Sequence, residues 1–274
     1  EKMKKLLLSA FVICLAGTSI AQESPLWMRH CALSPDGTTI AFTYKGDIYT
    51  VPSTGGRATQ ITTNPAFDTE PVWSPDSKQI AFASDRMGSL DVFVVSSEGG
   101  APQRLTTHSG SEKPVAYKDN KHILFTANIA PSAEDAGFPS GQFQQVYEVA
   151  VTGGRPAMFS SMPMECISIN KEGVMLYQDK KGYEDYWRKH QVSPIARDIW
   201  TYTPGKKPVY QKQTTFGGED REPVWSPDGK SFYYLSEEKG SFNIFQRTPG
   251  TTTSQQITFH TKPVSYTHLR AHET

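Results

Sequence analysis

The chain has 274 residues, of which 37% are hydrophobic and 11% are aromatic, so it can build a sizeable core in one large or two small domains. It carries 28 Lys and Arg residues against 28 Asp and Glu residues, and its formal net charge at pH 7 is zero. Proteins that hold nucleic acid present a strongly basic surface. This charge balance therefore excludes nucleic acid as an expected partner.

The first residues have the features of a secretory signal peptide. Two lysines follow Met3, the expected initiator, and an apolar run occupies residues 6–16 before a small-x-small cleavage site that ends at Ala21. Eleven apolar residues are too few to span a bilayer. We predict that residues 1–21 are a signal peptide and that the protein is exported to the periplasm, with secretion as the alternative. Lipidation at Cys14 and a retained membrane anchor are the alternatives to cleavage after Ala21.

A turn motif then recurs through the chain. The heptapeptide EPVWSPD occurs at 70–76 and again at 222–228, and SPDG or a variant of it recurs at intervals of 40, 43, 53 and 56 residues. Proline presets φ, aspartate hydrogen-bonds its own backbone and glycine accepts the strained exit, so this motif reverses the chain between two strands. The five copies begin at Ser34, Ser74, Tyr117, Asn170 and Ser226.

Each repeat unit continues with the same succession of apolar stretches. One stretch ends on an aromatic residue, at 40–42, 80–82, 123–125, 175–177 and 232–234. A second places a polar residue before an aliphatic and an aromatic residue, at 47–49, 91–93, 145–147, 198–200 and 243–245. β-Branched and aromatic residues favour strands, and four short strands with tight turns need about 40 residues, the length of a propeller blade.

The sequence therefore predicts an all-β chain that forms a β-propeller of WD40-like, four-stranded blades. Five blades are visible, and the recurrent aromatics are expected to wedge between them. We predict the blades to span about 27–63, 70–107, 112–160, 164–215 and 222–258, within a propeller over 24–262.

Two insertions lengthen the third and fourth repeat units. Residues 129–143 are rich in Pro, Gly and Ser and predict an exposed loop. Residues 178–197 mix charged with aromatic side chains, and such insertions are where binding surfaces concentrate. The candidate binding residues, suited to a peptide terminus or backbone, are Tyr183, Glu184, Asp185, Trp187, Arg188, Lys189 and His190. A solvated, salt-bridged loop is the equal alternative.

The chain shows no catalytic motif of a known kind: no G-x-S-x-G, no H-E-x-x-H, no Walker loop and no C-x-x-C. We expect no catalytic residue, no cofactor and no metal site here. Turn chemistry accounts for the recurring carboxylates Asp36, Asp76, Asp119, Glu172 and Asp228, which would face their own backbone.

Two cysteines, Cys31 and Cys166, fall in predicted strands of different repeat units. We interpret them as small buried hydrophobic residues. A disulfide between them is the alternative, and a metal pair a weaker one.

The end of the chain departs from the repeat pattern. After the fifth unit closes at Thr258, residues 264–274 read VSYTHLRAHET and lack the expected turn. This string resembles the conceptual translation of a transposase-type sequencing adapter. We predict that it is non-native and that the propeller ring is truncated at its C-terminus.

The repeats resemble the PD40 type of blade, which the TolB family, prolyl-oligopeptidase-like enzymes and tricorn-type peptidases share. The opening SPLWMRHCALSPDGTTIAFTYKGDIYTVPSTGG at 24–56 and YQDKKGYEDYWRKHQVSPIARDIW at 177–200 are similar to exported tricorn-like serine peptidases. That resemblance implies PDZ and peptidase domains further along the same chain, peptide or unfolded-protein substrates, and a possible homo-oligomer.

The same resemblance implies that the propeller guides peptides to a peptidase site and does no chemistry, so no catalytic residue of the family is carried over. Two different functions stay open beside this one. One is a TolB-like periplasmic scaffold that binds proteins. The second is the propeller lid of a prolyl-oligopeptidase-like hydrolase.

Overall fold

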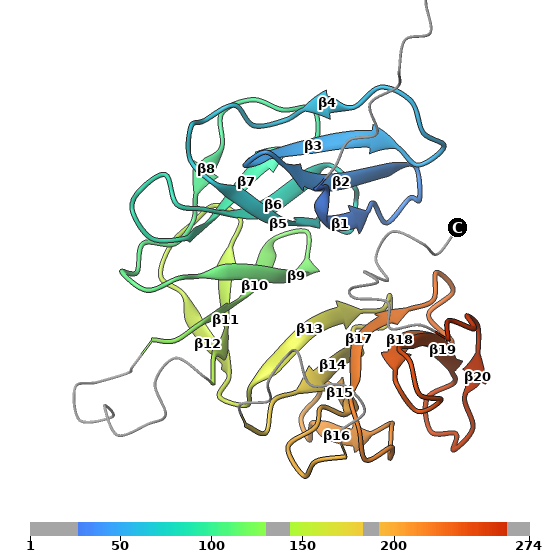
Figure 1. The fold of residues 1–274 in the computed structure, drawn as a ribbon. Helices are drawn as coiled ribbons and strands as arrows, with labels where there is room; N and C mark the ends of the chain where they lie inside the picture. Colours follow the sequence, from blue (N-terminus) through green and yellow to red (C-terminus); the bar gives the residue numbers. More distant parts are fainter. Residues whose placement is uncertain (1–26, 130–142, 183–191, 262–274) are drawn as a thin grey trace, which may run out of the picture.

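The computed structural model describes residues 27–129, 143–182 and 192–261, and these form five four-stranded antiparallel sheets (Figure 1). The first blade contains β1 (Arg29–Leu33), β2 (Thr39–Tyr44), β3 (Asp47–Pro52) and β4 (Thr59–Gln60). The second contains β5 (Asp68–Trp73), β6 (Gln79–Ser84), β7 (Asp91–Ser96) and β8 (Gln103–Arg104). The third contains β9 (Lys113–Asp119), β10 (His122–Ala127), β11 (Gln145–Ala150) and β12 (Ala157–Ser160).

The fourth blade contains β13 (Met164–Ile169), β14 (Met175–Asp179), β15 (Ile199–Thr203) and β16 (Val209–Lys212). The fifth contains β17 (Asp220–Trp225), β18 (Phe232–Ser236), β19 (Asn243–Arg247) and β20 (Gln255–Gln256). Each sheet follows chain order from its first to its fourth strand, and the first strands lie nearest the centre of the arrangement (Figure 1). The predicted all-β propeller with five four-stranded blades is therefore confirmed.

The described part of the chain has no helix that is long and apolar enough to cross a membrane. The predicted signal peptide at 1–21 and the unusual tail at 264–274 both lie outside the described residues.

In blades 1, 2, 4 and 5, threonines that follow the fourth strand bond to the third strand through their side-chain hydroxyls. Each of these hydroxyls accepts a hydrogen bond from a backbone N–H on the third strand, 14 or 15 residues earlier, at 2.9–3.0 Å. The fourth strands of blades 1, 2 and 5 have only two residues, so they offer few ladder bonds of their own. The hydroxyl therefore adds an anchor where the ladder is short. The pairs are Thr62 with Ile48, Thr106 with Val92, Thr214 with Ile199, and Thr258 with Ile244.

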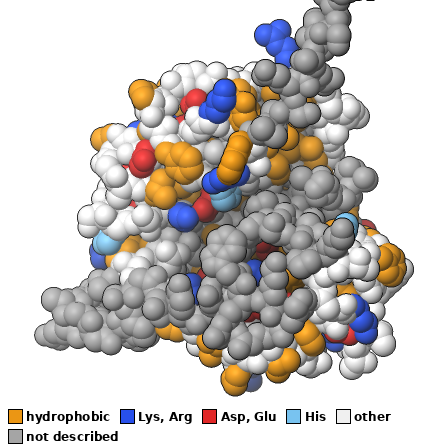
Figure 2. All heavy atoms as spheres, viewed as in Figure 1, with side chains coloured by type: hydrophobic (Ala, Val, Ile, Leu, Met, Phe, Trp, Pro, Cys, Tyr) orange, Lys and Arg blue, Asp and Glu red, His pale blue; other side chains and the backbone are white. Residues whose placement is uncertain are grey.

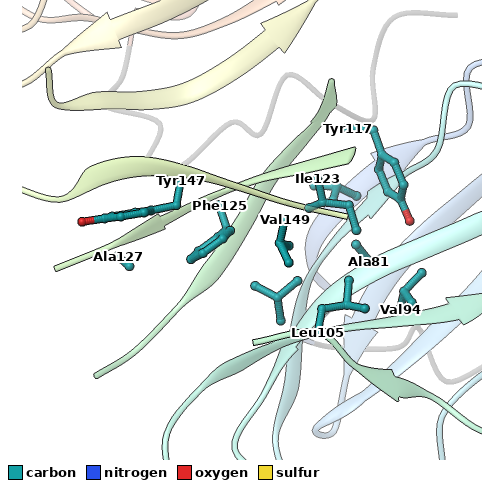
Figure 3. Close-up of a cluster of buried hydrophobic side chains, with 11 residues drawn as sticks. Ala81, Val94, Leu105, Tyr117, Ile123, Phe125, Ala127, Tyr147 and Val149 are labelled. Carbon is teal, nitrogen blue, oxygen red and sulfur yellow. The ribbon is translucent and has the colours of Figure 1, made fainter. Parts of the chain in front are cut away.

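Recurrent aromatics of blades 2 to 5 lie in the cores between blades, as predicted, whereas Phe42 of blade 1 stacks on Tyr49 of its own blade. Those that end the second-strand stretches are at most 5% exposed, and they are Phe42, Phe82, Phe125, Tyr177 and Tyr234. Figure 3 shows Phe125 and Tyr147 of blade 3 in a cluster with Ala81, Val94 and Leu105 of blade 2. Burying one such side chain contributes about 1.5–3 kcal/mol. At the third-strand positions the burial is less even, because Tyr49 and Trp200 are only half-buried.

The two EPVWSPD copies use their tryptophans to join neighbouring blades. Trp73 Nε1 donates to the carbonyl of Ala32 in blade 1 at 2.9 Å, and Trp225 Nε1 donates to the carbonyl of Val174 in blade 4 at 3.1 Å. Both indoles are buried. The repeated heptapeptide therefore encodes a blade-to-blade bond as well as a strand and a turn.

Candidate functional site: the axial cavity and the junction of blades 4 and 5

All five first strands line one cavity at the centre of the propeller. It has a volume of about 250 Å³, and its wall combines apolar, thiol, imidazole and carboxylate side chains: His30, Cys31, Glu70, Pro71, Pro114, Val115, Cys166, Glu222, Pro223 and Val224. Pockets that enclose small-molecule ligands span about 300–1,000 Å³. This cavity therefore suits one or two side chains or an extended peptide segment better than a whole cofactor.

A break in strand register at the same place in each blade builds this cavity. The pairing of the first with the second strand shifts at the residues that face the axis in all five blades. Such bulges redirect side chains and are common beside functional sites. Four of these positions have φ between 50° and 54°, a left-handed conformation that is costly for a residue other than glycine, and they are His30, Glu70, Cys166 and Glu222.

Charged and polar groups of neighbouring blades meet at the cavity wall. Glu70 forms an ion pair with Lys113 of blade 3 at 2.7 Å, with both side chains partly exposed. The backbone N–H of Glu222 donates to Gln178 Oε1 of blade 4 at 2.7 Å. In Figure 2, basic, acidic and histidine side chains lie together near the centre of the face that is shown. The axial wall can therefore contact both polar and apolar parts of a bound chain.

The two cysteines lie on this wall in β1 and β13, and no disulfide joins Cys31 to Cys166. They are partly exposed, so the interpretation as small buried hydrophobic residues is wrong for both. The bulges explain this, because they turn Cys31 and Cys166 toward the cavity. Burial raises the pKa of the Cys31 thiol.

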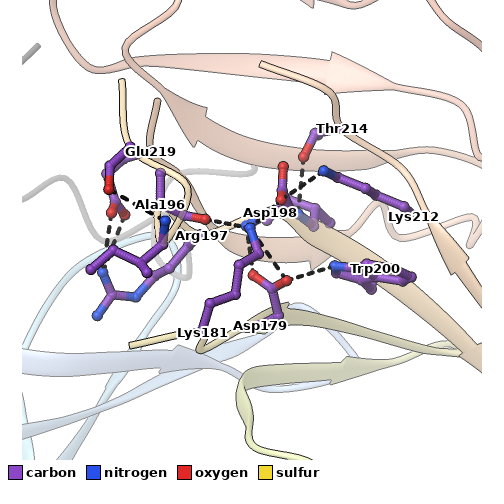
Figure 4. Close-up of polar contacts among 12 residues, drawn as sticks. Asp179, Lys181, Ala196, Arg197, Asp198, Trp200, Lys212, Thr214 and Glu219 are labelled. Carbon is purple, nitrogen blue, oxygen red and sulfur yellow. Dashed lines mark hydrogen bonds and ion pairs between the residues drawn. The ribbon is translucent and has the colours of Figure 1, made fainter. Parts of the chain in front are cut away.

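A second dense group of charges joins blades 4 and 5 (Figure 4). Arg197 lies between two carboxylates, with Nη1 3.2 Å from Glu219 and Nε 3.3 Å from Glu165. Lys180 approaches Glu165 at 3.0 Å. Burial alone would raise the pKa of Glu165, but the hydrogen bond from Gln178 and the charges of Lys180 and Arg197 hold it below its usual value. Glu165 is therefore an ionised part of a structural network.

This network also holds the base of the fourth-blade insertion. Lys181 contacts the Asp198 carboxylate and the carbonyl of Ala196. Asp179 accepts hydrogen bonds from the backbone N–H of Asp198 at 2.8 Å and from Trp200 Nε1 at 2.9 Å. The predicted binding residues Tyr183, Glu184, Asp185, Trp187, Arg188, Lys189 and His190 lie outside the described residues. Their two flanks are thus fixed to the blade 4 edge, while their role stays a prediction.

The recurring turn carboxylates face their own turns. Asp36 accepts from the backbone N–H of Thr38 at 3.0 Å and from the Ser34 hydroxyl at 2.5 Å, and Asp228 makes the same pair of bonds with Lys230 and Ser226. The hydrogen bond from Ser34 is the main reason that the pKa of Asp36 is lowered. Asp76 and Asp119 also accept from the backbone N–H two residues later.

Glu172 is the exception among these turn carboxylates, because its side chain accepts from Asn170 Nδ2 and not from its own backbone. Within 27–129, 143–182 and 192–261, no group of three or more His, Cys, Asp or Glu residues is placed to hold a metal ion.

Apart from Cys31 and Cys166, for which a disulfide or a metal pair was the alternative, the cavity residues were not among the sequence candidates. Their signal was the acidic or basic residue followed by proline in the first strand, as in Glu70-Pro71, Lys113-Pro114 and Glu222-Pro223. Proline lacks the N–H that a central ladder needs, so it marks a bulge or an edge. The sequence does not show that these three bulges and two more converge on one axis.

The fold and the axial cavity define a β-propeller domain with PD40-type blades. The family model of the tricorn protease N-terminal β-propeller domain matches residues 25–273. The chain belongs to this family of tricorn protease N-terminal propeller domains.

Two tricorn proteases are among the proteins that are similar to this chain. It is 39% identical over 213 residues to tricorn protease homolog 1 of Streptomyces coelicolor, a match that covers 77% of this chain and 19% of that protein. The crystal structure of the tricorn protease superposes with a TM-score of 0.67 at 16% identity, over 86% of this chain and 23% of that one.

A putative TolB from Agrobacterium tumefaciens has a TM-score of 0.66 at 14% identity, over 85% of this chain and 81% of that one. Because both structural identities are low, these two likenesses show the fold alone. The chain spans about a fifth of the length of the peptidase relatives that it matches.

Proposed function

We propose that this chain is the substrate-guiding propeller of an exported serine peptidase, and that it admits peptides without cutting them. The observation that carries this proposal is the axial cavity, to which all five first strands contribute, in a chain of the tricorn N-terminal propeller family. Every blade contributes residues to the wall of this cavity, and its polar and apolar groups suit a peptide backbone as well as side chains. The signal-like residues 1–21 support a periplasmic location.

The first experiment measures peptide binding by the chain itself. Fluorescein-labelled, unstructured peptides are titrated with the purified protein, and anisotropy reports the dissociation constant. Val115→Trp places an indole in the cavity wall, and we expect about a tenfold loss of affinity, which corresponds to about 1.4 kcal/mol. Val209→Trp is the matched control, because Val209 lies 56% exposed on the outermost strand of blade 4.

Equal affinities for the wild type and for a folded Val115→Trp protein would refute an axial peptide site. Far-UV circular dichroism establishes that both variants keep their strands. The same peptides, recovered after incubation with the wild-type chain, should be intact. Hydrolysis that a serine-directed reagent abolishes would contradict the non-catalytic role.

A further inference from the structure

The two EPVWSPD copies follow two aspartates that occupy the same place in their blades. Asp68 begins β5 and pairs with Ser84, while Asp220 begins β17 and pairs with Ser236. Both are buried, at 0% and 1% exposure. A carboxylate in such a place needs a cation or hydrogen-bond donors to stay ionised.

Blade 2 supplies that cation. Arg86, two residues after Ser84, places Nη2 2.9 Å from both carboxylate oxygens of Asp68. Its guanidinium lies over Phe82 and Phe93, at 5.5 and 4.6 Å from the ring centroids. The Asp68 carboxylate is therefore paired with a cation of its own blade.

Blade 5 retains the surroundings of this ion pair but replaces its cation with an acid. Tyr234 and Phe245 stand where Phe82 and Phe93 stand in blade 2, with their ring centroids 5.9 Å apart. The residue two after Ser236 is Glu238. Neither carboxylate oxygen of Asp220 has a hydrogen bond of normal geometry within the described part of the chain.

The nearby cations are engaged by other groups. Lys181 contacts Asp198, and Lys212 lies 2.8 Å from the same carboxylate. Arg197 is bound between Glu165 and Glu219, and the Arg221 guanidinium lies over the Phe242 ring at 4.0 Å.

The acids that face Asp220 come from both sides. Asp198 lies just before β15 of blade 4. Glu238 lies after β18, with Glu237 next to it in the chain, and the Tyr234 phenol of β18 also interacts with Asp220. Burial first, and then the charges of Asp198 and Glu238, raise the pKa of Asp220 to about 7, although the Ser236 and Thr214 hydroxyls partly offset them.

We propose that Asp220 is a proton-sensitive lock between blades 4 and 5, which holds the start of β17 in place when its carboxyl is neutral and loosens it when the carboxyl is ionised. The backbone N–H of Asp220 donates to the carbonyl of Arg197 at 3.1 Å, which joins β17 to the segment that leads into β15. Among the described residues no ion pair to Asp220 is found, and the Ser236 and Thr214 hydroxyls only partly offset the cost of burying its charge, so an ionised carboxylate draws in water or moves outward. Either change strains this bond.

The sign of the effect follows from the direction of the shift. The folded-state pKa is raised above the ordinary 3.8, so the stabilisation is full below that value and is lost as pH rises through about 7. Within this window, one proton changes the opening equilibrium by up to about tenfold per pH unit. The fifth blade is therefore most tightly closed in mild acid and more open at neutral to alkaline pH.

Hydrogen exchange of the β17 amides tests this proposal, with protection factors corrected for the intrinsic effect of pH. In the wild type, we expect protection at the start of β17 to fall between about pH 5 and 8. Asp220→Asn has no proton to lose, and its protection should not change over that range. Because burial also raises the pKa of Asp91 and of Glu112, the measured quantity is the difference between wild type and variant.

The blade 2 geometry supplies matched variants. Glu238→Arg restores the cation and should remove the pH dependence while raising protection at pH 8. Arg86→Glu should create a dependence of the same sign at the start of β5. Equal pH dependence in the wild type, Asp220→Asn and Glu238→Arg would overturn the proposal.

Carboxyl-carbon NMR of the aspartate-labelled wild-type chain gives a second readout. We expect one aspartate that titrates near pH 7 and is absent from Asp220→Asn. If every aspartate titrates below about pH 5, close to the ordinary range for this side chain, the lock does not exist.

Discussion

The bond from Trp73 to the neighbouring blade can be tested by removing one nitrogen and one ring. Trp73→Phe deletes the 2.9 Å hydrogen bond to the Ala32 carbonyl and leaves a smaller side chain in a site that is 9% exposed. The lost hydrogen bond costs about 1 kcal/mol. The lost packing costs about 1–2 kcal/mol more, since the core closes only in part around a shorter ring. We therefore expect the free energy of unfolding to fall by about 2–3 kcal/mol.

Urea denaturation followed by far-UV circular dichroism measures this change. The midpoint should decrease while the slope m stays constant, because the surface exposed on unfolding is nearly the same. In a thermal scan, the same loss corresponds to a decrease of roughly 5–10 °C in Tm.

The control is Trp27→Phe, because Trp27 is 74% exposed and outside the strands. It should change the free energy of unfolding by less than about 0.5 kcal/mol. If Trp73→Phe falls within that same limit, the tryptophan bond does not join the blades energetically.

Two further variants test the core and the insertion. Phe125→Ala empties a fully buried site in the cluster between blades 2 and 3, so we expect the free energy of unfolding, measured by urea denaturation, to fall by about 3–5 kcal/mol. A loss below about 1 kcal/mol would contradict the assigned core. Trp187→Ala combined with Arg188→Ala should weaken peptide binding by anisotropy if the insertion contacts the substrate, while unchanged affinity would favour a solvated loop.

The repeat made the architecture predictable from local chemistry. Ser34-Pro35-Asp36-Gly37 specifies a chain reversal within four residues, and its copies predict where each blade turns. The aromatic positions follow from strand propensity and spacing, so the sequence alone assigns Phe82 and Phe125 to the core, where both are buried.

The site was predicted less well, because it depends on contacts between blades. The candidate residues between 183 and 190 rested on the composition of the insertion at 178–197, and they lie outside the described residues. The axial cavity was missed, since a bulge is a change of register between two strands and leaves only a weak trace such as Glu70-Pro71. Convergence of five bulges on one axis is a property of the ring.

The sequence by itself determined that this protein is a repeated all-β chain, because turn and strand chemistry act within a few residues and each blade spells them again. Only the tertiary structure decided what two identical stretches do in different places. Glu70-to-Asp76 follows an aspartate that forms an ion pair with Arg86, whereas Glu222-to-Asp228 follows an aspartate that is buried near Glu238, with no cation paired to it among the described residues. Charge and burial arise from neighbours distant in the chain, so the same seven residues share one shape in two electrostatic environments.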